Sequence, residues 1–176
     1  MSGHVFVAIC PARLLASLCL MCSAVPSSSE VPPTLPARDA LSYYEGTWTL
    51  VNNPDGNRNW RETCSWLQGR KNHIACRALE NIEGITVETL SIYTYDEASG
   101  DYLYYGFRRR GNISVERGKR IPNGFQFMPA ASPGKPRTRT TLVEGDDGHA
   151  HTTDETLQAD GTWLVTKTVE YLHRRP

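Results

Sequence analysis

Residues Tyr93–Phe107 read YTYDEASGDYLYYGF, and this stretch decides how we interpret the rest of the chain. Aromatic-rich runs at 92–95 and 102–107 flank a polar connection at 96–101. Tyrosine and phenylalanine favour the half-buried surface of a sheet, whereas Asp, Ser and Gly are turn residues, and Gly100 can adopt a positive φ. The stretch therefore predicts a β-hairpin.

The same unit of strand and turn repeats from residue 46 onward. Strands are predicted at 46–52, 58–67, 72–79, 85–95, 101–108, 112–117, 125–128, 137–144, 151–157 and 162–173. No segment among them suits a helix that could connect parallel strands. About ten antiparallel strands leave two exposed edges unless the sheet closes, so the sequence predicts an all-β, up-and-down β-barrel. A β-sandwich is the alternative, with 130–136 as its crossover.

The N-terminal region differs from the strand region. Residues 1–24 contain no acidic residue and carry an apolar run before small residues that suit cleavage after Ala24, which predicts a secretory signal peptide. Residues 25–37 are rich in proline and serine and predict a linker. The barrel domain is expected over 38–176, beginning with a short helix that ends at Gly46. We expect the mature protein to be exported, periplasmic or secreted, without a stable membrane span.

Cysteine usage fits export. The three cysteines of the signal region would leave with it, so the mature chain keeps Cys64 and Cys76. An even pair in an oxidising compartment predicts a disulfide, and a three-residue loop between the second and third strands would place the two directly opposite each other. Two unpaired thiols are the alternative. Lipidation is less favoured, because neither Cys19 nor Cys22 follows a small residue.

Charge and composition exclude some classes of partner. The chain has 19 basic and 19 acidic residues, and 39% of its residues are hydrophobic. This supports one globular domain with a core and argues against a nucleic acid partner, which would require a basic excess. The basic run 108–110 is expected to be a solvated strand end. Since the chain contains no Gly-x-Ser-x-Gly motif, we assign no catalytic residue.

Three motifs, in order along the chain, resemble one family. They are Gly46-Thr47-Trp48, Tyr95–Tyr102 (Tyr-Asp-x-x-Ser-Gly-x-Tyr) and Asp160–Arg174 (Asp-Gly-x-Trp, then Val-Glu-Tyr and Arg). Together they resemble the bacterial exported calycin-like domains of unknown function, which are similar to the lipocalin and fatty-acid-binding-protein barrels. The resemblance covers residues 40–175. It implies the barrel fold and an internal cavity, but no established activity.

The resemblance also implies a structural pair. In calycins a tryptophan of the first strand closes one end of the barrel, and a basic residue of the last strand often packs across its ring. The matching residues here are Trp48 and Arg174 (or Arg175). Such a cation–π contact would stabilise the fold and would not bind ligand.

The side chains expected to face a cavity are aromatic, with one acid among them: Trp60, Glu62, Trp66, Tyr93, Tyr104 and Trp163. They predict a site for a small lipophilic or aromatic molecule. If aromatic side chains instead fill the barrel, its outer surface would act in protein interaction, and an exposed tyrosine patch on the central hairpin would indicate this. A buried Glu62 with a shifted pKa would favour an enzyme acting on such a molecule.

Two histidine patterns raise the question of metals. His149-x-His151 beside Asp146-Asp147 has ligand types on one strand face, although polar residues are expected at a hairpin tip. His173 has the C-terminal position that some haem-binding calycins use, but its basic neighbours favour a solvated tail. We expect no metal and no cofactor. Ligand identity and oligomeric state do not follow from the sequence.

Overall fold

The computed structural model describes residues 37–52, 59–67, 71–82, 84–108, 111–145 and 147–176. The predicted signal peptide, and all but the last residue of the predicted linker, lie outside the described residues. The strands of the described part are β1 Gly46–Asn52, β2 Asn59–Trp66, β3 His73–Ile82, β4 Ile85–Asp96, β5 Asp101–Phe107, β6 Ile113–Ile121, β7 Gly124–Pro129, β8 Thr138–Glu144, β9 His149–Leu157 and β10 Trp163–Arg174. In this part of the chain, no helix is long and apolar enough to cross a membrane.

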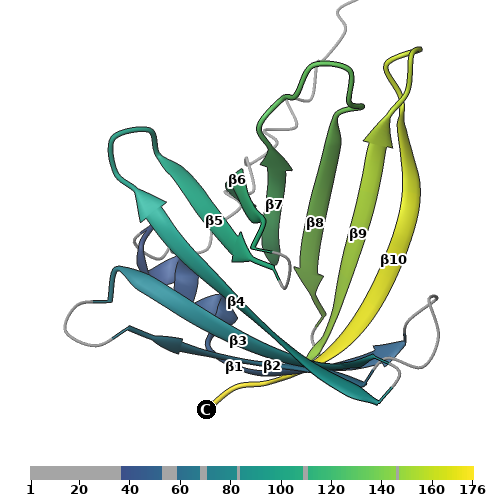
Figure 1. The fold of residues 1–176 in the computed structure, drawn as a ribbon. Helices are drawn as coiled ribbons and strands as arrows, with labels where there is room; N and C mark the ends of the chain where they lie inside the picture. The colour runs from purple at the N-terminus through teal and green to yellow at the C-terminus, as the bar shows by residue number, and fades with distance from the viewer. Residues whose placement is uncertain (1–36, 53–58, 68–70, 83, 109–110, 146) are drawn as a thin grey trace, which may run out of the picture. The chain divides into compact units, whose positions relative to one another are not determined.

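The strands form a closed barrel. Each strand pairs antiparallel with its neighbours in sequence, and β1 closes the ring by pairing with β10 (Figure 1). The predicted all-β antiparallel barrel is therefore confirmed. The sandwich alternative is wrong, because the loop after β7 leads to β8, its hydrogen-bonded neighbour. Closure pairs the backbone groups that a sheet edge would leave exposed.

The predicted hairpin is confirmed as β4 and β5, and in it Tyr93 lies directly opposite Tyr104. Asp96 organises its turn: the carboxylate accepts a hydrogen bond from the Ser99 hydroxyl at 2.7 Å. Gly100 follows with a φ of 68°, a conformation that glycine adopts without steric cost. Each turn residue singled out in the sequence thus has a local function.

Strand β6 extends four residues beyond its predicted end at Arg117, to Ile121. Gly118, the first residue past the predicted end, is a packing position within the strand. A Cβ atom on Gly118 would lie 2.5 Å from Cδ1 of Phe127, so only glycine leaves room for that ring. Phe127 is consequently buried in the core.

The expected short helix is a single 3-10 segment, η1, at Asp39–Tyr44. It buries Ala40, Leu41 and Tyr44 and packs against β3 and β4. The Tyr44 ring stacks on Tyr93 of β4 with centroids 3.9 Å apart. We call the end of the barrel that η1 covers the helix end, and the opposite end, where the turns after β3, β5, β7 and β9 lie, the far end.

The predicted disulfide is present. Cys64 of β2 lies directly opposite Cys76 of β3, with Cα atoms 4.0 Å apart, and both are buried. Closing a loop of this length stabilises a folded chain by about 3 kcal/mol on the chain-entropy model. The bond joins two adjacent strands on the inner face of the barrel.

Aromatic side chains fill the barrel at the helix end. Phe125 is almost fully buried and packs edge-on against Tyr102 with centroids 4.9 Å apart. Trp48 donates a hydrogen bond from its indole N–H to the backbone oxygen of Tyr44 at 2.9 Å, which ties β1 to η1. Such contacts combine large buried area with specific ring geometry. The core is therefore concentrated at one end of the barrel.

Candidate functional site

A cavity of about 260 Å³ lies inside the barrel. It extends from Tyr44 and Trp48 at the helix end to Arg108, an exposed residue at the far end. Its lining therefore joins the packed core to a solvent-exposed side chain. The barrel is filled at one end and hollow in its middle, so both sequence-based alternatives for the interior apply to different parts of it.

One part of the cavity wall is aromatic: Tyr44, Trp48, Trp60, Tyr93, Tyr104, Phe127 and Tyr171. Their rings pack on one another across strands. Tyr93 and Tyr104 have centroids 5.1 Å apart, as do Trp60 and Tyr171. These cross-strand contacts hold the rings in place and leave part of their surface facing the cavity.

The other part of the wall is polar: Glu62, Ser91, Arg108, Glu116, Thr140 and Thr152. Thr140 donates a hydrogen bond to Asp154 at 2.7 Å. Burial raises the pKa of the Glu116 carboxyl, the nearby Arg108 charge lowers it, and the Asp154 charge raises it. The opposite charges of Glu116 and Arg108 thus balance each other toward the far end of the cavity.

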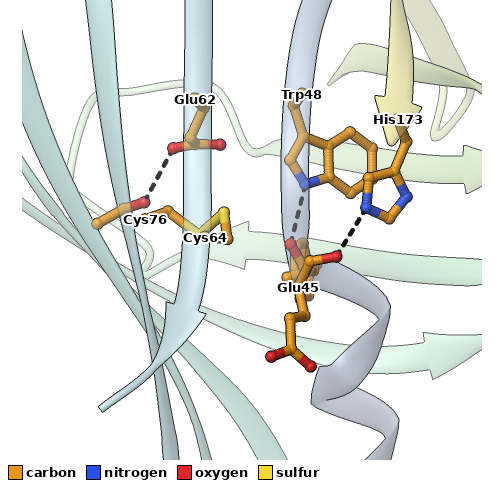
Figure 2. The surroundings of a disulfide bond; sticks show 8 residues. Glu45, Trp48, Glu62, Cys64, Cys76 and His173 are labelled. Atoms are coloured by element: carbon orange, nitrogen blue, oxygen red, sulfur yellow. Dashed lines mark hydrogen bonds between the residues drawn. A yellow bond between two sulfur atoms is a disulfide. The ribbon is translucent and has the colours of Figure 1, made fainter. Parts of the chain in front are cut away.

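Glu62 lies on the inner face of β2, beside the disulfide (Figure 2). Ser91 of β4 donates a hydrogen bond to its carboxylate at 3.3 Å, the one hydrogen bond that the described residues give it. Burial raises the pKa of Glu62 to about 7, and the Ser91 hydrogen bond opposes this rise. Its residual solvent exposure is explained by the cavity beside it.

The tyrosines around Glu62 remain neutral phenols. Burial, together with the nearby carboxylates, raises the pKa of Tyr93 and Tyr44 far above the usual value. The pKa of Tyr171 rises to about 12 for the same reasons. Neutral phenols keep their hydroxyl protons, so they can donate hydrogen bonds to a ligand.

The structure brings together four of the six predicted ligand residues: Trp60, Glu62, Tyr93 and Tyr104 all line the cavity. Trp66 and Trp163 do not line it. The Trp66 indole N–H donates to Glu45 at 3.1 Å, near the helix end. Trp163 lies under the guanidinium of Arg139, which is 4.2 Å from the ring centroid.

Several lining residues were missed from the sequence. Tyr171 shares a strand face with the buried Val169 and His173, so the period-two pattern of the last strand could have identified it. Glu116 lies opposite Tyr104, and the register of neighbouring strands carries that information. Tyr44 comes from a turn of 3-10 helix, and no sequence periodicity indicates that its ring reaches the cavity.

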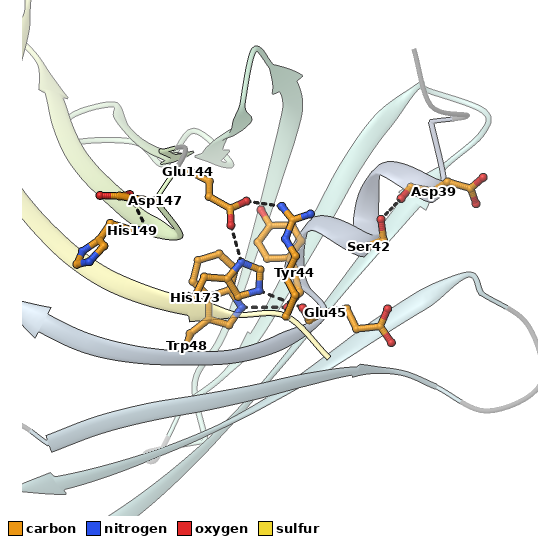
Figure 3. A network of polar contacts seen from close by, with 10 residues as sticks. Asp39, Ser42, Tyr44, Glu45, Trp48, Glu144, Asp147, His149 and His173 are labelled. Carbon is orange, nitrogen blue, oxygen red and sulfur yellow. Dashed lines mark hydrogen bonds and ion pairs between the residues drawn. The ribbon is translucent and has the colours of Figure 1, made fainter. Parts of the chain in front are cut away.

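Trp48 has a different partner from the one that the resemblance implied. His173 stacks on its ring with centroids 3.8 Å apart and planes 8° apart (Figure 3). Arg174, the expected partner, is exposed and lies opposite Thr47. Because side chains alternate along a strand, the residue paired with Trp48 points inward and its neighbour points outward. The last strand does supply the residue that covers Trp48, one position earlier than expected.

Glu144 and the backbone fix the orientation of His173. Its Nδ1 lies 3.0 Å from Glu144, and its Nε2 lies 3.0 Å from the backbone oxygen of Glu45. Arg175 donates to the same Glu144 carboxylate at 2.6 Å. Both ring nitrogens are engaged by protein oxygens, so neither is free to bind a haem iron.

The His149 pattern also has a protein partner. Its Nδ1 lies 2.8 Å from Glu170, and its backbone N–H donates to Asp147, while Asp146 lies outside the described residues. Among the described residues, the group with metal-ligand spacing is Glu62, Cys64 and Cys76. The disulfide occupies both sulfurs, which leaves Glu62 alone.

Comparison of the chain with models of known protein families, and with curated proteins, finds no match.

Proposed function

We propose that the protein is an exported, calycin-like barrel that binds a small aromatic molecule in its cavity without reacting with it. The observation that carries the proposal is the lining itself, in which seven aromatic side chains and a few polar groups face one cavity. This combination is typical of small-molecule sites. The three motifs that resemble calycin-like domains support the same interpretation.

The volume narrows the ligand class. An engineered cavity of about 150 Å³ binds benzene, whereas sites for drug-sized ligands occupy roughly 300–1,000 Å³. The cavity here, at about 260 Å³, therefore fits one aromatic ring with a short substituent. A long acyl chain would need to displace the aromatic core at the helix end.

Export is part of the proposal. The signal-peptide pattern in residues 1–24, the disulfide and the absence of a spanning helix among the described residues are all compatible with a periplasmic or secreted protein. Nucleic acid is not a partner that we propose, because the chain has equal numbers of basic and acidic residues.

An acid–base enzyme is the second candidate, and Glu62 favours it. A carboxyl with a pKa of about 7 can take up or give a proton at neutral pH. We place this candidate second because Ser91 is the one described side chain hydrogen-bonded to Glu62, and no described histidine or lysine contacts the pair as a base would.

Calorimetric titration with single-ring compounds (indole, 4-methylphenol, 2-phenylethanol) tests the proposal, with decanoate as the long-chain comparison. We expect at least one ring compound to bind with a micromolar Kd and decanoate to bind at least tenfold more weakly. Trp60→Leu should weaken binding about tenfold or more, since Trp60 lines the cavity. Trp163→Leu is the matched control and should leave the affinity unchanged.

Mass spectrometry of the recovered ligand separates the two candidates. A carrier returns the compound unchanged after long incubation, whereas an enzyme returns a product whose formation stops in Glu62→Gln. If none of the ring compounds binds at millimolar concentration, the cavity proposal is wrong.

A further inference from the structure

Among the described residues, Glu62 has no basic partner, unlike many of the other acidic side chains. Several other described acids pair with basic side chains, as in Arg38–Glu97, Arg77–Glu88, Arg117–Asp101, Arg139–Glu155 and Arg175–Glu144. Burial and the Ser91 hydrogen bond shift the pKa of Glu62, and no described cation contributes to this shift. A buried carboxylate without a partner is costly, so its presence in a cavity points to a partner that comes from outside.

Arg108 does not neutralise it. Of the described residues that line the cavity, Arg108 alone is a cation, and it is exposed at the far end. Its charge lowers the pKa of Glu116, which shows that it lies close to that carboxyl. The inner part of the cavity therefore carries the negative charge of Glu62, and the outer part is nearly balanced.

Aromatic rings surround the same carboxyl. The Glu62 charge raises the pKa of Tyr44, Tyr93, Tyr104 and Tyr171, so all four phenols lie within its field. The faces of tyrosine and tryptophan rings attract cations, and more strongly where water is excluded. A carboxylate among aromatic rings is an arrangement that recognises a protonated amine.

We infer that the ligand is a small aromatic amine, whose ammonium group pairs with the Glu62 carboxylate while its ring packs among Tyr93, Tyr104 and Trp60. This inference rests on the proposed binding function and adds the charge of the ligand to it. Ser91 keeps one carboxylate oxygen oriented and leaves the other for the ammonium group. The volume of about 260 Å³ accommodates a phenylethylamine-sized molecule.

The pairing makes binding depend on pH. The ion pair requires ionised Glu62, whose pKa is about 7, so amine affinity should rise as the pH increases through 7. Aliphatic ammonium groups stay protonated to about pH 10, and the surrounding tyrosines stay neutral. The other charged groups that face this region are Glu116, Arg108, Asp154 and Glu80. Glu116 also has a raised pKa, so it needs its own control.

Calorimetry with three compounds of equal ring and chain length tests the inference: 2-phenylethylamine, 2-phenylethanol and 3-phenylpropionate. At pH 8 we expect the amine to bind at least tenfold more tightly than the alcohol, and the acid to bind most weakly. Glu62→Gln should abolish the preference, so that the variant binds the amine no more tightly than the alcohol. Glu116→Gln is the matched carboxyl control and should keep the preference.

A pH series on the unmodified protein gives a second test that needs no variant to fold. Between pH 5.5 and 8.5 the ionised fraction of a group with a pKa near 7 rises about thirtyfold, and amine affinity should rise by about that factor. The affinity for the alcohol should change less than twofold. A flat amine profile would overturn the inference.

The outcomes distinguish a failure of the amine inference from a failure of the aromatic-binding proposal on which it rests. If the alcohol binds as tightly as the amine, the inference is wrong and the aromatic-binding proposal stands. If 3-phenylpropionate binds most tightly, the inference is wrong and Arg108 becomes the recognising group. If none of the three binds, the inference fails, and the indole and 4-methylphenol titrations then decide whether the cavity binds aromatic compounds at all.

Discussion

The helix end of the barrel is packed and cross-linked, whereas the far end exposes apolar side chains around a partly hollow interior. At the helix end Leu41 has an exposed fraction of 0%, and the disulfide and Trp48 lie nearby. At the far end Ile85 is 56% exposed and Ile113 is 61% exposed. The same ten-stranded sheet therefore provides a rigid base and a less densely packed opposite end.

This difference shows how a small barrel can combine stability with a cavity. A cavity removes van der Waals contacts and lowers stability, so the contacts elsewhere must offset it. Here the stabilising contacts that offset the cavity are concentrated in η1, the aromatic core and the disulfide. All three lie on the inner side of the barrel or at the helix end. The side chains of the far end therefore do not need to pack tightly, and this suits ligand entry.

Trp48→Ala is expected to have the largest effect on stability. It removes a buried ring that stacks on His173 and hydrogen-bonds to Tyr44, so the free energy of unfolding should fall by about 3–5 kcal/mol. Urea unfolding followed by circular dichroism measures it. Trp163→Ala at the far end is the matched control and should cost about 1 kcal/mol or less. Equal losses would show that the two ends are not distinct.

Loss of the disulfide should cause the second-largest loss of stability. In the double variant Cys64→Ala with Cys76→Ala, the free energy of unfolding should fall by about 3 kcal/mol, since the unfolded chain gains entropy. Denaturant unfolding with and without dithiothreitol measures this loss. Reductant should destabilise the unmodified protein and have no effect on the double variant. If reductant also destabilised the double variant, the effect of reductant on stability would not come from the disulfide.

Glu62→Gln should have an effect that depends on pH. The folded protein holds the Glu62 proton to about pH 7, but the unfolded chain releases it near pH 4.3. Stability of the unmodified protein therefore falls as the pH rises between these values. The variant should be more stable by about 3–4 kcal/mol at pH 8.5 and equally stable at pH 4. Thermal unfolding across this range measures it, and a constant difference would argue against a buried, ionising Glu62.

The smallest effect is expected for Arg139→Met at the far end. Arg139 makes two hydrogen bonds to Glu155, at 2.6 and 2.8 Å, and covers Trp163. Partly exposed pairs of this kind contribute about 0.5–1 kcal/mol, and high salt screens them. Unfolding in low and high salt should show the loss shrinking in high salt. A loss as large as that of Trp48→Ala would contradict the comparison of the two ends.

The fold followed from the sequence because local signals and strand pairing agree. Turn residues such as Gly100 mark the hairpins, and the register that placed Cys64 opposite Cys76 rests on loop length alone. The predicted strand stopped at Arg117, although β6 continues through Gly118 to Ile121. A glycine needed by a ring on the neighbouring strand cannot be recognised without knowing which side chain lies across from it.

The site was less predictable than the fold. Alternation on one strand correctly grouped Trp60 with Glu62, because a period of two is enough there. Trp163 was misplaced because aromatic character alone does not distinguish the cavity from the surface. The raised pKa of Glu62 depends on burial from several strands at once, and so it becomes visible only in three dimensions.

The pairing of β1 with β10 also governs how the protein reaches this structure. Thr47 lies opposite Arg174, so the ring closes through contacts between residues at opposite ends of the domain. Such non-local pairing slows folding, since the intervening chain must be ordered before the closing contacts form. Until the last strand arrives, β1 and β9 each present an unpaired edge, and Trp48 lacks the ring of His173. A chain held at that stage would be prone to edge-to-edge association, so timely arrival of β10 protects the protein from aggregation.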